Sequence, residues 1–170
     1  MRILIIAICF ILYAFLPEST AAAFGVSETN LWGCLSYHFF HASWLHLIIN
    51  AVCFYLLYKP VRTLWIKRLD DNMFLTNMYF SATFAGMFAA QSTPTVGLSG
   101  IVFAILGALL VLNPTKKQLQ NYIYLALAVA IQMYFGRSNT LLHIFAFALG
   151  ALTVIIHTAA DSIRIKDTDE

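Results

Sequence analysis

The sequence predicts an all-α membrane protein, a single bundle of six transmembrane helices over residues 1–170 with both termini in the cytoplasm. Of its residues, 61% are hydrophobic and only 11% are charged, whereas soluble domains carry about 25% charged residues. Six apolar stretches follow one another along the chain, and the basic residues gather in alternate connections between them. These observations exclude an ordinary soluble domain and give no sign of a nucleic-acid-binding surface.

The six apolar stretches are the expected membrane spans. They cover about residues 3–16, 45–58, 73–90, 98–112, 119–135 and 141–157. Several are shorter than the ~20 residues that usually cross a bilayer, which helices packed around a wet cavity can tolerate. A weakly polar segment, residues 17–40, separates the first two stretches.

The first stretch permits a second interpretation. Its basic start, its apolar core and the small residues that follow are also typical of a cleaved signal peptide. We favour a retained helix, because a six-helix bundle would lose one wall without it.

The positions of the basic residues predict the orientation. One side of the membrane receives Arg2, Lys59, Arg62, Lys67, Arg68, Lys116, Lys117, Arg164 and Lys166. The other side receives only Arg137. Because cytoplasmic connections are enriched in Lys and Arg, both termini are expected in the cytoplasm. The expected location is a bacterial inner membrane.

Polar groups are costly inside the stretches and are therefore candidates for function, and four of them are considered first. His46 and Asn50 are four residues apart and share one helix face. Ser99 opens the fourth stretch and His143 the sixth. At 1.5 Å per helical residue, His46, Ser99 and His143 all lie about 20–27 Å from the cytoplasmic ends of their stretches. This common depth predicts one shared site.

Ser99 stands in the sequence GLSG, directly before a long apolar run. A helix from there to Leu112 covers only about 22 Å, so its N-terminus must lie inside the membrane. The preceding residues, 91–97, are then expected as irregular backbone that lines a cavity or is buried in protein. Free N–H groups and the helix dipole would favour a developing oxyanion at this point.

These residues resemble the rhomboid intramembrane serine proteases, through HLIIN (His46, Asn50), GLSG (Gly97 to Gly100) and HIFAFALG (His143 to Gly150). The resemblance implies a six-helix fold that hydrolyses peptide bonds of membrane-anchored proteins, with transmembrane proteins as substrates. It implies Ser99 as nucleophile and His143 as its general base. His46, Asn50 and the Ser99 N–H would bind the oxyanion. All eight acidic residues lie in loops or tails, which predicts a dyad without a carboxylate.

Three residues depart from the family pattern. Gly33 follows Trp32 where the family often carries arginine, and the loop that holds them is short. Ala146 replaces the first glycine of the usual HxxGxxxG, whereas Gly150 keeps the second. Phe103 stands where a tyrosine commonly stacks on the catalytic histidine. None of these changes removes a group that the dyad needs, and Gly97, Gly100, Phe103, Ala146 and Gly150 are expected to support the site.

Two alternatives remain at this point. A catalytically inactive relative would bind membrane helices without cleaving them, although such relatives typically lack the serine or the histidine. A haem or quinone protein would use the five histidines, but it needs no serine between glycines. No HExxH motif or CxxC spacing indicates a metal site, so no metal or cofactor is expected. We expect His41 to anchor a loop, and His38 and His157 to lie at the membrane interfaces.

Overall fold

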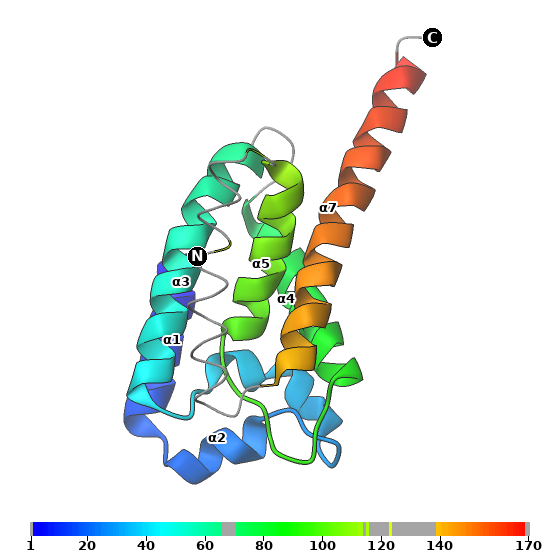
Figure 1. Ribbon diagram of the computed structural model, residues 1–170. Coiled ribbons are helices and arrows are strands. Elements are labelled where there is room, and N and C mark those ends of the chain that lie inside the picture. The colour runs from blue at the N-terminus through cyan, green and yellow to red at the C-terminus, as the bar shows by residue number, and fades with distance from the viewer. Residues whose placement is uncertain (1, 66–70, 114, 116–122, 124–138, 169–170) are drawn as a thin grey trace.

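The computed structural model describes residues 2–65, 71–113, 115, 123 and 139–168. This part of the chain is helical and contains no strand. Its elements are α1 (Arg2–Phe15), α2 (Glu18–Phe24), η1 (Leu31–Leu35), η2 (Tyr37–Phe39), α3 (Trp44–Trp65), α4 (Asp71–Phe88), α5 (Ser99–Leu112) and α7 (Thr140–Thr168) (Figure 1). The expected fifth span, residues 119–135, lies outside the described residues apart from Ile123.

The other five expected spans coincide with α1, α3, α4, α5 and α7. Two of these helices continue well beyond the apolar stretch. Helix α3 runs to Trp65 and includes Pro60, so the expectation that Lys59 and Arg62 lie in a connection is wrong. Helix α7 runs to Thr168 through its charged end. Hydropathy marks where a helix leaves the apolar layer, whereas backbone hydrogen bonding continues through polar residues such as Lys and Arg, which are good helix formers.

The segment between α1 and α3, residues 17–43, is called loop 1 from here on. It is compact, because the amide of Asn30 donates hydrogen bonds to the carbonyls of Ala23 (2.9 Å) and Gly25 (3.1 Å). Gly33 packs against the main chain of Gly25 so closely that a Cβ atom at position 33 would overlap its carbonyl. Loop 1 therefore has no room for a side chain at the position where the family often carries arginine.

Helix α3 is apolar on both of its faces. Leu45, Ile48 and Val52 are exposed, whereas Phe54 and Leu57 on the opposite side are buried. A soluble amphipathic helix would place polar residues on its outer face, so this pattern indicates a lipid-facing surface. By length and composition, one described segment is long and apolar enough to cross a membrane, Thr140–Ala160, while α1 and α5 are shorter apolar helices.

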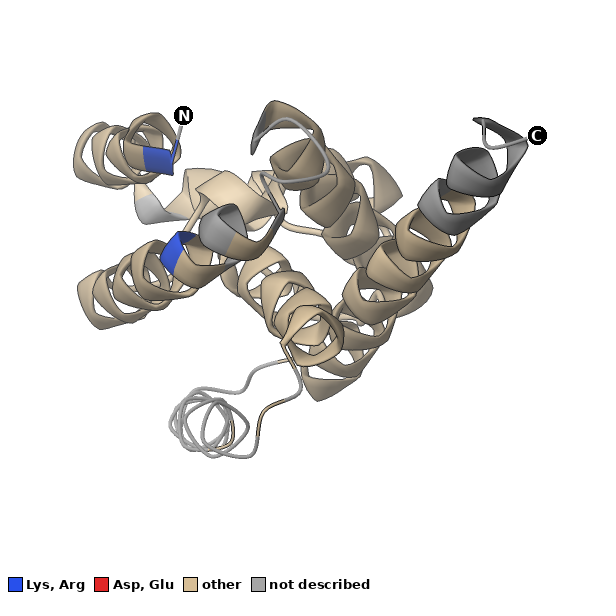
Figure 2. Ribbon diagram, turned by 90° about the horizontal axis from the view of Figure 1, so that it is seen from above, with Lys and Arg blue, Asp and Glu red and all other residues tan. Residues whose placement is uncertain are grey.

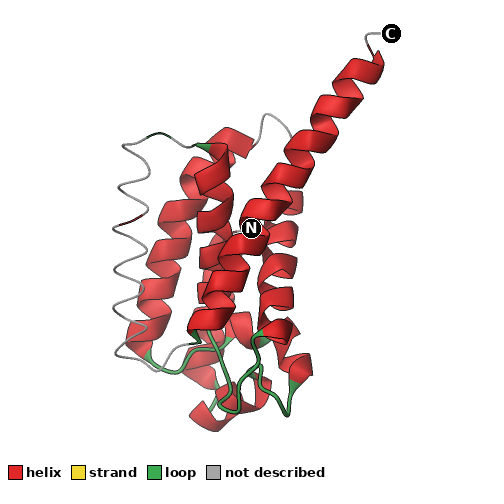
Figure 3. Cartoon of the chain, turned by 45° about the vertical axis from the view of Figure 1, so that its right-hand side comes forward, coloured by secondary structure: helices red, strands yellow, loops and turns green. Residues whose placement is uncertain are grey.

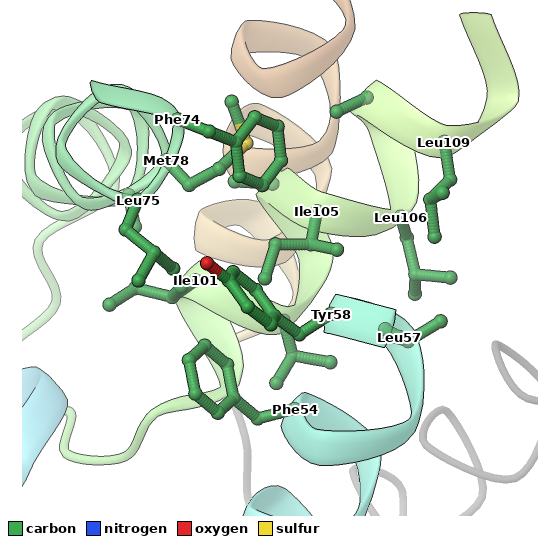
Figure 4. Close-up of a cluster of buried hydrophobic side chains, with 14 of the residues drawn as sticks. Phe54, Leu57, Tyr58, Phe74, Leu75, Met78, Ile101, Ile105, Leu106 and Leu109 are labelled. Atoms are coloured by element: carbon green, nitrogen blue, oxygen red, sulfur yellow. The ribbon is translucent and has the colours of Figure 1, made fainter. Parts of the chain in front are cut away.

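Helix α5 lies in the middle of the molecule, between α3, α4 and α7 (Figure 1). Its residues from Ser99 to Leu109 are buried except for Phe103. Ile101, Ile105 and Leu109 pack with side chains of α3 and α4 in the main apolar cluster (Figure 4). The loops gather at the end of the bundle where α5 begins (Figure 3). The core therefore fixes α5 along its length and holds its first residue beneath these loops.

Candidate active site

Ser99 is the first residue of α5 and is 6% exposed. The residues that lead to it, 90–98, contain no helix or strand, so the expectation of an irregular approach is confirmed. Gly97 has a φ of 129°, a backbone conformation that residues with a Cβ rarely adopt. This glycine turns the chain so that the next residues can start the helix.

The structure brings Ser99 and His143 together. The Nε2 atom of His143 lies 2.7 Å from Oγ of Ser99, a buried hydrogen bond between α5 and α7. Within the described part of the chain, Nδ1 of His143 has no hydrogen-bond partner. The ring of Phe103, one turn after Ser99, lies 4.5 Å from the imidazole, centroid to centroid. A hydroxyl and an imidazole in this arrangement can exchange a proton.

His46 and Asn50 lie next to Gly97. A Cβ atom at position 97 would be 2.7 Å from Cε1 and 2.8 Å from Nε2 of His46. It would be 3.2 Å from Nδ2 of Asn50. Asn50 is 2% exposed, and its Nδ2 has no partner among the described residues. Two polar side chains of α3 therefore lie beside Gly97, two positions before Ser99. The side-chain amide of Asn50 still has hydrogens to donate.

Helices α5 and α7 touch through their main chains. A Cβ atom added at Gly150 would overlap the carbonyl of Ala104, and one added at Gly107 would overlap that of Phe147. Ala146 is fully buried on the same side of α7. At Gly100, a Cβ atom would first meet the hydroxyl of Tyr37 in loop 1 and then, at 3.3 Å, the side chain of Leu142 in α7. The absence of a side chain at Gly100 therefore leaves room for Tyr37 of loop 1 as well as for α7.

Asn139 fixes the start of α7, a role that our reading of the apolar stretches missed. Its side-chain oxygen accepts a hydrogen bond from the N–H of Leu142 (3.1 Å), and its amide donates to the carbonyl of Ala89 (2.6 Å) and to Thr95 (3.2 Å). Asparagine is a preferred N-cap residue, so an Asn directly before an apolar run was the available signal. The cap places His143 one turn into the helix.

Loop 1 holds the segment before Ser99. The N–H of Gly97 donates to the carbonyl of Tyr37 (2.8 Å), and the N–H of Leu98 donates to Nε2 of His41 (3.3 Å). The expectation that His41 anchors a loop agrees with this contact. Tyr37 is fully buried and donates its hydroxyl to the carbonyl of Ala82. Sequence reasoning did not find Tyr37.

The expectation that His38 lies at a membrane interface is wrong. The residue is fully buried within the protein, and its Nε2 lies 3.2 Å from the hydroxyl of Thr83 in α4. Burial lowers the pKa of His38 to about 3, although the carbonyl of Cys34 opposes the shift. His157 pairs with Asn77 of α4 across 3.0 Å. Both histidines therefore join elements of the fold.

A cavity of about 240 Å³ lies between α1, α2 and the start of α3. Leu12, Phe40, His41 and Trp44 are among its lining residues, whereas Ser99 and His143 are not. The described residues contain no cluster of three or more His, Cys, Asp or Glu that could hold a metal ion. The groups that the structure places at Ser99 are its own hydroxyl and the imidazole of His143, with His46 and Asn50 beside the nearby Gly97.

The exposed apolar side chains and the apolar helix Thr140–Ala160 are typical of an integral membrane protein. The chain matches the Rhomboid domain over residues 28–160. It therefore belongs to the rhomboid family, whose typical members are intramembrane serine proteases. No curated protein matches the chain significantly.

Proposed function

We propose that the chain is an intramembrane serine endopeptidase that cleaves membrane-anchored proteins in or near their transmembrane segments. The observation that carries the proposal is the buried 2.7 Å hydrogen bond between Nε2 of His143 and Oγ of Ser99 at the N-terminus of α5. A packing serine needs no imidazole partner, and an inactive relative has no reason to keep both groups in contact.

In the proposed reaction, Oγ of Ser99 attacks the carbonyl carbon of the scissile peptide bond while Nε2 of His143 takes the hydroxyl proton. The carbonyl oxygen becomes an oxyanion. His46, Asn50 and the N–H of Ser99 donate hydrogen bonds to it, helped by the unpaired amides of the first turn of α5. His143 then gives its proton to the leaving amine. Water hydrolyses the acyl-enzyme by the same route in reverse order.

The proposal includes six transmembrane helices, cytoplasmic termini and a bacterial inner membrane. One contact supports this orientation. The guanidinium of Arg2 lies 4.7 Å from the ring centroid of Tyr55 and 5.8 Å from that of Tyr58. Tyr58 directly precedes Lys59 in the sequence. Figure 2, viewed from this end, shows the blue ribbon of basic residues on α1 near the N-terminus and on α3. Two basic residues that are distant in the sequence thus lie at the same end of the bundle.

The decisive experiment combines a fluorophosphonate probe, which labels only an activated serine, with cleavage of a reporter that carries a single transmembrane segment. Wild type should label and cleave, whereas Ser99→Ala and His143→Ala should do neither, because dyad members act as a unit. The matched control is Ser81→Ala. Ser81 is a buried membrane serine whose hydroxyl lies 3.2 Å from that of Thr153, and its loss should leave labelling intact.

A well-inserted wild-type protein that neither labels nor cleaves would refute the proposal and favour the inactive relative that only binds membrane helices. Cleavage by Ser99→Ala at the wild-type rate would refute the nucleophile assignment alone. A Soret band in the purified protein would instead revive the haem alternative.

A further inference from the structure

Hydrogen bonds at four places join loop 1 to residues 90–98, the segment that precedes Ser99. The N–H of Glu28 donates to the carbonyl of Gln91 (2.9 Å). Thr95 and Val26 exchange a pair of main-chain hydrogen bonds (2.8 and 3.0 Å). Two residues later, the N–H of Gly97 donates to the carbonyl of Tyr37 (2.8 Å). The N–H of Leu98 then donates to Nε2 of His41 (3.3 Å). Of these four contacts, only the last is made by a side chain, and it holds the amide immediately before that of Ser99.

The contact with Leu98 defines the state of the His41 ring. Since Nε2 accepts a hydrogen bond, it carries no proton, and the proton of the neutral ring lies on Nδ1. Burial lowers the pKa of His41 to about 3, and the neighbouring His46 acts in the same direction, whereas the carbonyl of Phe39 opposes the shift. The ring therefore stays neutral and remains an acceptor at ordinary pH.

Packing alone does not fix this ring, because His41 lines the cavity between α1, α2 and α3. Its other neighbour is the ring of His46, which lies 5.2 Å away, centroid to centroid, at an angle of 67°. His41 thus contacts both the peptide that precedes Ser99 and the ring of His46. The ring of His46 is one of the groups that the proposed reaction directs at the oxyanion, and Leu98 directly precedes another, the N–H of Ser99.

We propose that His41 is a positioning residue: by accepting the Leu98 N–H, it sets the orientation of the following Ser99 amide and keeps it aligned with His46. This inference rests on the protease function proposed above. Because the Leu98 amide donates to His41, it is withheld from the oxyanion site, and the next amide, that of Ser99, takes this role. Small displacements matter here, because a misplacement of about 1 Å can cost roughly a hundredfold in rate.

A pair of substitutions separates this role from simple packing. In His41→Gln the side-chain oxygen can occupy the place of Nε2 and accept the Leu98 N–H. In His41→Asn the side chain is shorter and cannot reach it. Leu12→Ala is the matched control, since Leu12 lines the same cavity and is not bonded to the segment before Ser99.

We expect His41→Asn to lower kcat about 10- to 100-fold with an unchanged KM, because the lost contact acts on the transition state. His41→Gln should restore most of kcat, and Leu12→Ala should lower the melting temperature without a matching loss of kcat. Hydrogen–deuterium exchange of residues 96–99 should be faster in His41→Asn than in wild type or His41→Gln.

The exchange readout is independent of catalysis. Unchanged protection of residues 96–99 in His41→Asn would overturn the inference even if the chain had no protease activity. The inference would also be overturned if His41→Gln and His41→Asn lost kcat equally and each loss followed the fall in melting temperature. His41 would then be a packing residue. A third outcome separates the two proposals. If the fluorophosphonate probe does not label wild type, and residues 96–99 lose protection only in His41→Asn, the protease proposal is refuted. The contact between His41 and Leu98 is then still established.

Discussion

Gly150 of α7 lies directly against the main-chain carbonyl of Ala104 in α5. No side chain separates the two helices at this point, so they approach as closely as backbones allow. His143 stands two turns before Gly150 on the same face of α7, and Ser99 stands at the head of α5. The contact between Gly150 and Ala104 therefore sets the separation at which Nε2 of His143 meets Oγ of Ser99.

The first prediction concerns the pH dependence of labelling. A protonated His143 cannot accept the proton of Ser99, so fluorophosphonate labelling of wild type should fall as the pH drops, with a slope approaching tenfold per pH unit. His143→Gln should remain unlabelled at every pH, because no imidazole is left to activate Ser99. Labelling of His143→Gln with the same pH profile as wild type would contradict a histidine base.

The second prediction concerns stability in acid and the two buried histidines of loop 1. The pKa values of His38 and His41 are lowered to about 3 by burial, whereas an unfolded histidine has a pKa near 6.5. The unfolded chain therefore binds more protons than the folded chain between these values. Stability should be fully present above about pH 6.5 and be lost progressively toward pH 3.

Thermal unfolding in detergent from pH 7.5 to pH 4 measures this loss. The double variant His38→Gln, His41→Gln should begin with a lower melting temperature, because it replaces two packed rings, but it should lose less on acidification than wild type. An equally steep decline in the double variant would show that other groups are responsible.

Ser99, His143, His46 and Asn50 could be predicted because a polar group inside an apolar stretch is conspicuous and the rise per helical residue gives its depth. The structure brings Ser99 and His143 into contact and sets His46 and Asn50 around Gly97; their roles in catalysis stay predictions.

The rest of the site could not be read from the sequence in this way. Tyr37 contacts the main chain of Ala82, 45 residues away, and of Gly97, and His41 contacts that of Leu98, 57 residues away; no periodicity records such contacts. His38 was misplaced because composition cannot tell burial in protein from burial at a membrane interface. The ends of α3 and α7 were missed because hydropathy follows the lipid boundary and not the helix.

The third prediction concerns Asn139. Asn139→Ala removes the N-cap of α7 and leaves the carbonyl of Ala89 without its amide donor. The loss of the cap should cost about 1 kcal/mol, and the unsatisfied carbonyl about 1–3 kcal/mol more. The melting temperature and the labelling of Ser99 should both fall, because the first turn of α7 also carries His143.

The matched control for Asn139 is Thr140→Ala. Thr140 is exposed and is the first residue of α7, so its replacement should change neither measurement. If Asn139→Ala melted and labelled as wild type does, the cap would not position His143.

The last prediction concerns Ala146, which replaces the glycine usual in the family. Ala146 is fully buried and belongs to the apolar cluster that contains Leu142 and residues of α4 and loop 1, and Phe103 of α5 packs against this cluster. It shares the face of His143 and Gly150, three and four residues away. Because a well-packed site rejects added methylenes, Ala146→Leu should force α7 away from α5 and abolish cleavage, whereas Ala146→Gly should stay active.

The test compares Ala146→Leu with Ala148→Leu, since Ala148 is exposed on another face of α7 and its enlargement should be tolerated in lipid. Both variants are first checked for normal insertion. Labelling by the fluorophosphonate probe then reports whether His143 still activates Ser99, and cleavage of the transmembrane reporter reports the complete reaction. If Ala146→Leu cleaves as fast as wild type, the close approach of α5 and α7 does not control the distance between His143 and Ser99.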